Sequence, residues 1–137
     1  RLYELGRSYG VFVAQENVVR CRSHSAQFIG EMRSALGEDV RFVLDTKQAV
    51  RAGQDLFEMV DAMGERLLHV HLSDHSERGD CLPVGSGTLD IKRLLNALKT
   101  VGFDENVIME LYRENFDEPE ELMVSLKTLE YFSETYK

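Results

Sequence analysis

The fold is decided by residues 64–74, which read GERLLHVHLSD. A glycine suited to ending a helix stands before the apolar run Leu67–Leu72, and the run stops at the polar pair Ser73-Asp74. This order is typical of a helix end, a glycine cap and a buried β-strand. It predicts that His71 lies at the carboxyl end of a strand.

The same order occurs four times along the chain. Helices are predicted at residues 1–9, 25–36, 55–63 and after the candidate N-cap Asp90. The glycines that end them are Gly10, Gly37, Gly64 and Gly102, and the predicted strands are residues 11–14, 40–44, 67–72 and 107–109. A last helix is predicted from its apolar stripe and a proline near its first turn, with Pro119, Leu122, Leu126 and Leu129.

Apolar strands that alternate with helices favour parallel pairing, with helices covering the sheet. Right-handed crossovers then give an α/β fold of four parallel βα units. Hydrophobic periodicity alone does not distinguish a closed barrel from an open sheet. The length of 137 residues fits a single domain over residues 1–137.

Each unit ends in a side chain that can bind a metal. Glu16, Asp45, His71 and Glu110 follow their cap glycines by 6, 8, 7 and 8 residues. The carboxyl ends of parallel strands meet at one edge, so these side chains are expected to converge. Three carboxylates with one imidazole suit Mn²⁺ or Mg²⁺, with Co²⁺ or Zn²⁺ as alternatives. Taken singly, such a carboxylate also serves as a helix cap, and such a histidine as a core residue.

Composition excludes several classes of function. The chain has 24 acidic and 16 basic residues, a net charge of −8, and basic residues scattered along the sequence. No nucleic-acid partner is therefore expected. No apolar run approaches the length of a membrane span and no signal peptide is recognisable, so we expect a cytoplasmic protein without a membrane partner. The two cysteines have no zinc-site spacing.

Five stretches together resemble the xylose isomerase-like barrels, which include sugar-phosphate isomerases/epimerases and family 2 AP endonucleases. They are Gln15-Glu16-Asn17-Val18, Val43-Leu44-Asp45-Thr46, His69-Val70-His71-Leu72-Ser73-Asp74, Leu82-Pro83-Val84-Gly85-Ser86-Gly87 and Met109-Glu110-Leu111-Tyr112. The resemblance implies that Glu16, Asp45, His71 and Glu110 bind a catalytic divalent cation. It also implies that Glu16 and Glu110 exchange protons with the substrate.

This resemblance predicts a metal-dependent sugar or sugar-phosphate isomerase or epimerase. A cation that polarises a carbonyl makes the proton on the adjacent carbon easier to remove, and carboxylates on either side can take and return it. Residues placed to contact a small sugar substrate are Lys47, Gln48, Arg78 and Arg113, with Asn17 and Asp74 supporting the metal ligands. The alternatives are a solvated lysine at a helix start, salt bridges for the arginines, and a loop cap for Asp74.

Two positions depart from the endonuclease pattern. Endonuclease-type members carry a histidine three residues after the aspartate, where this chain has Gln48, and further histidines where it has only Cys81. A three-zinc phosphodiesterase site is therefore disfavoured. An AP endonuclease-like phosphodiesterase and a non-catalytic half-barrel assembly module remain the alternative functions.

The length bears on the architecture. A complete barrel needs about 250 residues, and the four predicted units resemble its C-terminal half. We expect the chain to be part of a longer barrel. The outer strands would then have unpaired edges, which favour self-association or a homo-oligomer.

Overall fold

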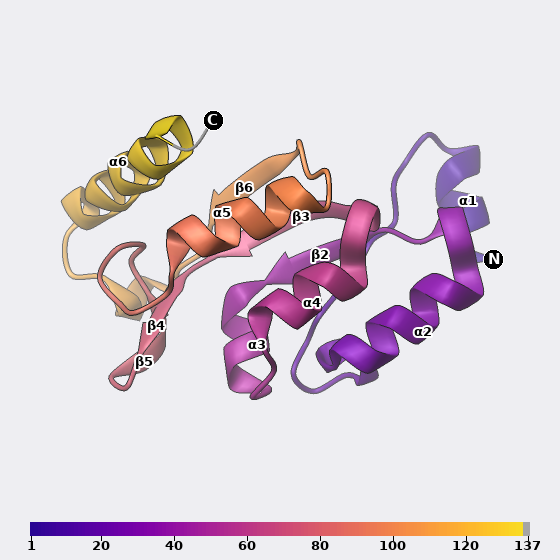
Figure 1. Cartoon of the computed structure of the whole chain (residues 1–137), viewed down its shortest axis with the longest axis horizontal. Helices are drawn as coiled ribbons and strands as arrows, with labels where there is room; N and C mark the ends of the chain where they lie inside the picture. The colour runs from indigo at the N-terminus through magenta and orange to yellow at the C-terminus, as the bar shows by residue number, and fades with distance from the viewer. Residues whose placement is uncertain (136–137) are drawn as a thin grey trace.

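The computed structural model describes residues 1–135 and has an α/β fold. Its main sheet contains β1 (Gln15–Glu16), β2 (Phe42–Asp45), β3 (Leu67–Leu72) and β6 (Asn106–Met109), in that spatial order. Every neighbouring pair is parallel. Strands adjacent in the sheet are joined through helices, so the predicted fold of four parallel βα units is confirmed (Figure 1).

Helices surround this sheet, and those that lie over it cover one face. The helices are α1 (Leu2–Ser8), α2 (Ala26–Leu36), α3 (Thr46–Arg51), α4 (Leu56–Met63), α5 (Ile91–Thr100) and α6 (Pro119–Thr135). Short 3₁₀ turns lie at Arg22–His24, Gly37–Asp39, Gly64–Arg66 and Arg113–Asn115. In Figure 1, α2, α4 and α5 lie in a row over the sheet, and α1 and α6 lie at its two ends. No helix within residues 1–135 is both long and apolar enough to cross a membrane.

Local sequence signals set the helix ends. Ser25, Asp55 and Asp90 each accept a backbone N–H in the first turn of the helix that follows. The glycines predicted to end helices all have positive φ, which only glycine adopts without strain; they are Gly10, Gly37, Gly64 and Gly102.

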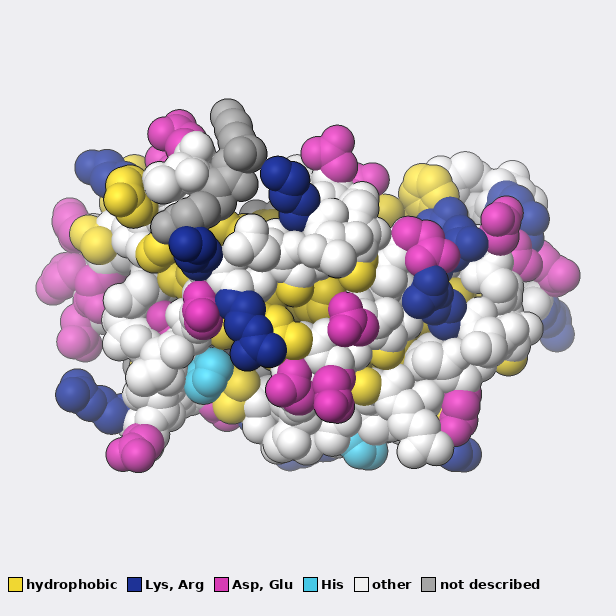
Figure 2. All heavy atoms as spheres, in the orientation of Figure 1, with side chains coloured by type: hydrophobic (Ala, Val, Ile, Leu, Met, Phe, Trp, Pro, Cys, Tyr) yellow, Lys and Arg dark blue, Asp and Glu magenta, His cyan; other side chains and the backbone are white. Residues whose placement is uncertain are grey.

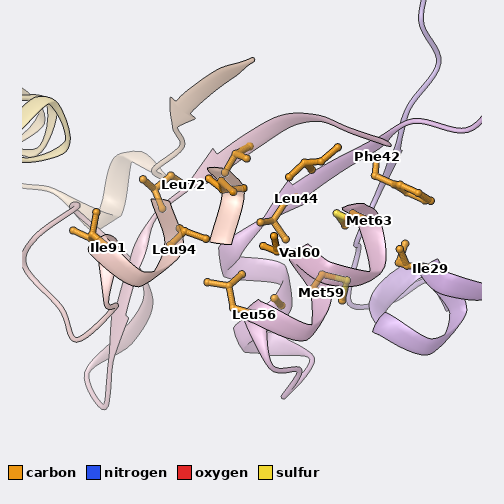
Figure 3. Close-up of a cluster of buried hydrophobic side chains, with 14 of the residues drawn as sticks. Ile29, Phe42, Leu44, Leu56, Met59, Val60, Met63, Leu72, Ile91 and Leu94 are labelled. Carbon is orange, nitrogen blue, oxygen red and sulfur yellow. The ribbon is translucent and has the colours of Figure 1, made fainter. Parts of the chain in front are cut away.

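The core lies between the sheet and the helices that cover it. Figure 3 shows side chains of β2 and β3, such as Phe42, Leu44 and Leu72, facing side chains of α4 and α5, such as Val60 and Leu94. All five are essentially inaccessible to solvent. Burial of this apolar surface fixes which face of each strand meets the helices, and parallel pairing brings the carboxyl ends of the strands to one edge.

The first predicted strand was wrong in its extent. Residues 11–14 form no strand, and Phe12 is 71% exposed. Pairing with β2 begins only at Gln15, because the segment before β2 forms the turn Gly37–Asp39 instead of a strand. The last helix begins at Pro119 as predicted, but Leu126 on its apolar stripe is 37% exposed, while Leu129 packs against the core.

A hairpin that was not predicted from the sequence follows β3. It consists of the antiparallel strands β4 (Asp74–Ser76) and β5 (Gly79–Leu82). The buried carboxylate of Asp74 accepts backbone N–H groups from His75, Gly85, Gly87 and Leu89, so it holds the loop between the hairpin and α5. This backbone approaches so closely that a Cβ atom on Gly87 would collide with Asp74 and with the carbonyl of His75.

Charged side chains of both signs are mixed on the face that the helices form. Figure 2 shows Lys and Arg interspersed with Asp and Glu across this face. Three ion pairs fasten neighbouring elements there: Arg7 with Asp39, Arg33 with Glu65, and Arg66 with Glu38. Exposed pairs of this kind contribute little stability each.

We predict that Gly87→Ala destabilises the chain by about 1–3 kcal/mol, because the added methyl group must displace the loop that Asp74 holds. Gly30→Ala is the matched control. Gly30 is an interior residue of α2, and a Cβ atom added there meets nothing within 4 Å. This variant is expected to be neutral or to stabilise by up to about 1 kcal/mol. Urea unfolding followed by circular dichroism measures both; equal stability of the two variants would contradict the prediction.

Candidate metal centre

Four side chains meet at the carboxyl edge of the sheet. Glu16 and Asp45 end β1 and β2, His71 lies next to the end of β3, and Glu110 directly follows β6. One ligand atom from each lies within 4.8 Å of the others. The structure therefore brings together the four residues that the sequence analysis selected.

Backbone pairing fixes these positions. Asp45 lies opposite His71 in the register of β2 and β3. The Glu110 N–H donates to the Leu72 carbonyl at 3.0 Å, which continues the pairing of β3 with β6 by one residue. Adjacent parallel strands are about 5 Å apart, so residues at equivalent strand ends can share one small ligand.

Asn17 connects the end of β1 to Asp45. Its side-chain oxygen accepts the Asp45 N–H at 2.7 Å, and its amide nitrogen donates to the Asp45 carbonyl at 2.9 Å. Asn17 is fully buried. The side chain thus takes the place of a strand partner beyond Glu16 and connects the ends of β1 and β2.

The two oxygen atoms of Asp45 have separate roles. Oδ1 accepts the Gln48 N–H at 3.0 Å and caps α3. Oδ2 lies 3.3 Å from the Lys47 ammonium. Thr46 supports this junction, because its hydroxyl donates to the Ser73 carbonyl and accepts the Ser73 N–H, each at 2.9 Å. The ends of β2 and β3 are therefore cross-linked directly after Asp45.

His71 and Glu110 present unpaired atoms to the same point. Nδ1 of His71 lies 2.9 Å from Oε2 of Glu110 and 3.5 Å from Oε1 of Glu16. Within residues 1–135, Nδ1 and Oε2 are both buried and have no hydrogen-bond partner. Buried polar atoms are rarely left unpaired. An imidazole nitrogen and a carboxylate oxygen turned toward one another in this way fit a shared divalent cation.

The cluster disfavours the ionised form of Glu16. Partial burial, followed by the nearby Asp45 and Glu110 carboxylates, raises the pKa of Glu16, and His71 opposes this increase. Burial beside His71 lowers the pKa of His69, whose ring packs edge-on against that of His71 at 5.1 Å. The negative charge on Glu16 is therefore poorly solvated in this cluster.

Lys47 is the cation of this cluster. Its side chain is 2% exposed, and its Nζ lies 3.3 Å from Asp45 Oδ2 and 3.2 Å from Glu110 Oε1. Burial opposes the charged form, but the two carboxylates outweigh this effect and raise the pKa of Lys47. The ammonium also lies 4.5 Å from the centre of the Tyr112 ring.

A second group of contacts near the site was not foreseen from the sequence. Arg51 in α3 donates to Asp80 in β5 at 2.6 and 3.1 Å, and to the Tyr112 hydroxyl at 3.3 Å. The Arg51 guanidinium holds the pKa of Asp80 below its usual value. These residues are 29 and 61 positions from Arg51, and no local pattern relates them.

The remaining predicted site residues have other partners. Gln48 accepts the Val19 N–H at 3.0 Å. Arg78 lies in the exposed turn of the β4–β5 hairpin, and Arg113 donates to the Phe116 carbonyl at 2.6 Å. Asp74 anchors the loop described above, as in the loop-cap alternative. The buried Cys81 thiol lies 3.7 Å from the Glu110 carbonyl, to which it donates.

The sequence profile described as "Xylose isomerase-like TIM barrel" matches residues 1–132. The chain belongs to this family. Among curated proteins, it is 26% identical over 125 residues to the inosose isomerases of Bacillus velezensis (strain DSM 23117 / BGSC 10A6 / LMG 26770 / FZB42) and Bacillus subtilis (strain 168). Each alignment covers 84% of this chain and 45% of the relative. The chain thus spans about half the length of the curated relatives it matches.

Solved structures show the same fold. A D-tagatose 3-epimerase-like protein superposes with a TM-score of 0.74 at 19% identity, over 98% of this chain and 51% of that one. The 3-keto-D-glucoside 4-epimerase YcjR of E. coli gives 0.74 at 22% identity, over 95% and 49%. The IolI protein with a bound zinc atom gives 0.70 at 23% identity, over 98% and 53%. The family's TIM-barrel architecture is therefore shared over about half of each structure.

We predict that Asn17→Ala lowers the free energy of unfolding by about 3 kcal/mol, because it leaves the N–H and C=O of Asp45 unpaired in a buried place. Asn96→Ala, at an exposed position in α5, is the control and should change stability by less than about 0.5 kcal/mol. Chemical denaturation measures both. A loss no larger than that of the control would show that the Asn17 contacts are not formed in solution.

A second prediction concerns pH. The pKa of Glu16 is raised in the folded chain, so ionised Glu16 destabilises the metal-free chain at pH values above that pKa. This loss of stability disappears as the pH falls through the raised pKa toward the ordinary value of 4.5. Glu16→Gln should therefore raise the melting temperature in chelator at about pH 8, with a smaller gain at about pH 5. The exposed Glu105→Gln is the control. A gain that is independent of pH would refute this assignment.

Proposed function

We propose that this chain is half of a metal-dependent sugar isomerase or epimerase that transfers a proton next to a carbonyl. The observation that carries the proposal is the group of four convergent side chains, in which His71 Nδ1 and Glu110 Oε2 are buried, lie 2.9 Å apart and find no hydrogen-bond partner among the described residues. The family and the sugar-converting relatives support the same class of reaction.

The donor set fits a divalent cation. Glu16, Asp45, His71 and Glu110 would hold it, with Mn²⁺ or Mg²⁺ favoured by the three carboxylates and Co²⁺ or Zn²⁺ compatible with the imidazole. When bound, such an ion polarises a substrate carbonyl and lowers the barrier to removing the proton on the adjacent carbon.

Glu16 and Glu110 are the proposed proton-exchanging groups. They stand at the two outer strands of the sheet, with His71 between them at 3.5 and 2.9 Å. One carboxylate removes the proton on one side of the substrate plane, and the other group returns a proton from the opposite side or to the neighbouring carbon. The raised pKa of Glu16 brings its proton affinity closer to that needed at neutral pH.

The substrate class follows from the chemistry of the relatives. Inosose, D-tagatose and a 3-keto-glucoside, which the relatives' names mention, are polyhydroxylated compounds with a carbonyl beside a hydroxyl-bearing carbon. We propose a small substrate of this kind. Gln48 and Arg113 are committed to backbone partners, which leaves Arg78 as the more available predicted substrate contact.

The barrel interior is proposed to be completed by four further βα units that pair with β1 and β6. Ile108 on β6 is 51% exposed, whereas its neighbours Val107 and Met109 pack against the core, so Ile108 lies on the face opposite the packed helices. A closed barrel would bury this face and would remove both sheet edges. Self-association through the same edges is the expectation for the chain alone.

Calorimetry with Mn²⁺ on the chelator-stripped chain tests the metal centre. We expect one ion per chain, and an affinity at least about tenfold lower for Glu110→Gln, because one charged oxygen ligand is lost. Glu114→Gln, an exposed glutamate four residues later, is the control and should bind as the wild type does. Absence of binding to the folded chain would contradict a preformed centre.

The reaction is tested on a polypeptide that contains all eight βα units. Incorporation of deuterium from deuterated water into an inosose or a ketohexose, measured with Mn²⁺ and with chelator, should require the metal and should be abolished in Glu16→Gln and Glu110→Gln. Exchange that persists in both variants would exclude these carboxylates as the proton carriers.

A further inference from the structure

Lys47 is a buried cation that is almost fully enclosed by protein. Among the charged residues of the core, its side chain is enclosed to the same degree as Asp45, and both are 2% exposed. An ammonium group removed from water is strongly disfavoured unless fixed charges surround it. Asp45, Glu110 and the Tyr112 ring supply that environment.

The two oxygen atoms of the Glu110 carboxylate have different neighbours, and Lys47 is the neighbour of one of them. Oε1 lies 3.2 Å from the ammonium, while Oε2 lies 2.9 Å from His71 Nδ1 and has no hydrogen-bond partner in the part of the chain that the structure describes. With one oxygen attached to a buried cation, the plane of the carboxylate is set and the second oxygen is directed at the cluster. Glu110 is only half-buried and follows the end of β6, so little else restrains its side chain.

The same ammonium changes the charge of the site. Three carboxylates and one ammonium, with a neutral imidazole, leave two negative charges for a divalent ion to balance. Without Lys47 there would be three. Since like charges a few ångströms apart repel strongly in a buried place, the ammonium must weaken the binding of a second cation by the same carboxylates.

We propose that Lys47 is a positioning residue that acts as a fixed counter-cation: it orients Glu110 and lowers the affinity of the cluster for a divalent metal. This inference rests on the proposed function. In that setting a loaded site with Lys47 has no net charge, whereas a site without it would carry one negative charge and would repel the negative charge that develops on a substrate losing a proton.

Metal affinity separates this role from a structural one. Lys47→Met keeps the length of the side chain and removes the charge. Because the effect of removing the charge is expected to exceed the effect of losing the orientation of Glu110, Mn²⁺ should bind the folded variant at least about tenfold more tightly than the wild type. Loss of a residue that acts only through orientation or structure would weaken binding. Lys99→Met, which removes the charge of an exposed lysine in α5, is the matched control and should leave the affinity unchanged. Equal or weaker binding by folded Lys47→Met would overturn the proposal.

A second measurement uses the wild-type chain and needs no metal. In chelator, ¹⁵N-lysine labelling should reveal one ammonium signal protected from exchange with water, assigned to Lys47, and Glu110→Gln should weaken its protection. Absence of a protected signal would overturn the inference. Because this test uses the wild-type chain, it applies even if Lys47→Met does not fold. A wild-type chain that binds no Mn²⁺ but shows the protected signal would contradict the preformed metal centre of the proposed function and leave the ion pair with Glu110 in place.

Discussion

Repulsion among the carboxylates at the carboxyl edge of the sheet is the constraint on which the rest of the site depends. Glu16, Asp45 and Glu110 contribute atoms within 4.8 Å of one another, in a place that disfavours ionised Glu16. Such a group would spread apart if each side chain were free to move. It is held by main-chain restraints: the Asn17 bridge, the cap on α3 and the hydrogen bond from Glu110 to Leu72.

These restraints explain why the site could be predicted from the sequence. Glycine caps, apolar strands and the residue at which each strand stops are local signals, and parallel pairing converts four such signals into one place in space. The positions of Asp45 and His71 follow from this reasoning alone, and the register confirms that they lie opposite one another. The fold class and the order of the helices were predictable for the same reason.

Other features depend on contacts between distant residues and left no local signal. A lysine after a strand is ordinarily solvated; Lys47 is buried because Glu110 and Tyr112, more than 60 positions later, enclose it. The β4–β5 hairpin lacks a strong turn dipeptide, and Asp74 at its start was assigned to His71 or to a loop. Its four backbone partners are scattered over 15 residues. Residues 11–14 are apolar but form no strand, since the partner segment turns away.

The junction between β2 and α3 also limits how this region can vary. The strand ends at Asp45 and the helix begins at Thr46, with no residue between them. Surface loops usually accept insertions at small cost, but an inserted residue here would separate the helix cap from the strand end, and Asp45 could no longer serve both. Changes in chain length are therefore expected in longer connections, such as the segment between β1 and α2 and the segment between β6 and α6. Insertions and deletions in this half-barrel are therefore expected in those connections, while the junction between β2 and α3 keeps its length.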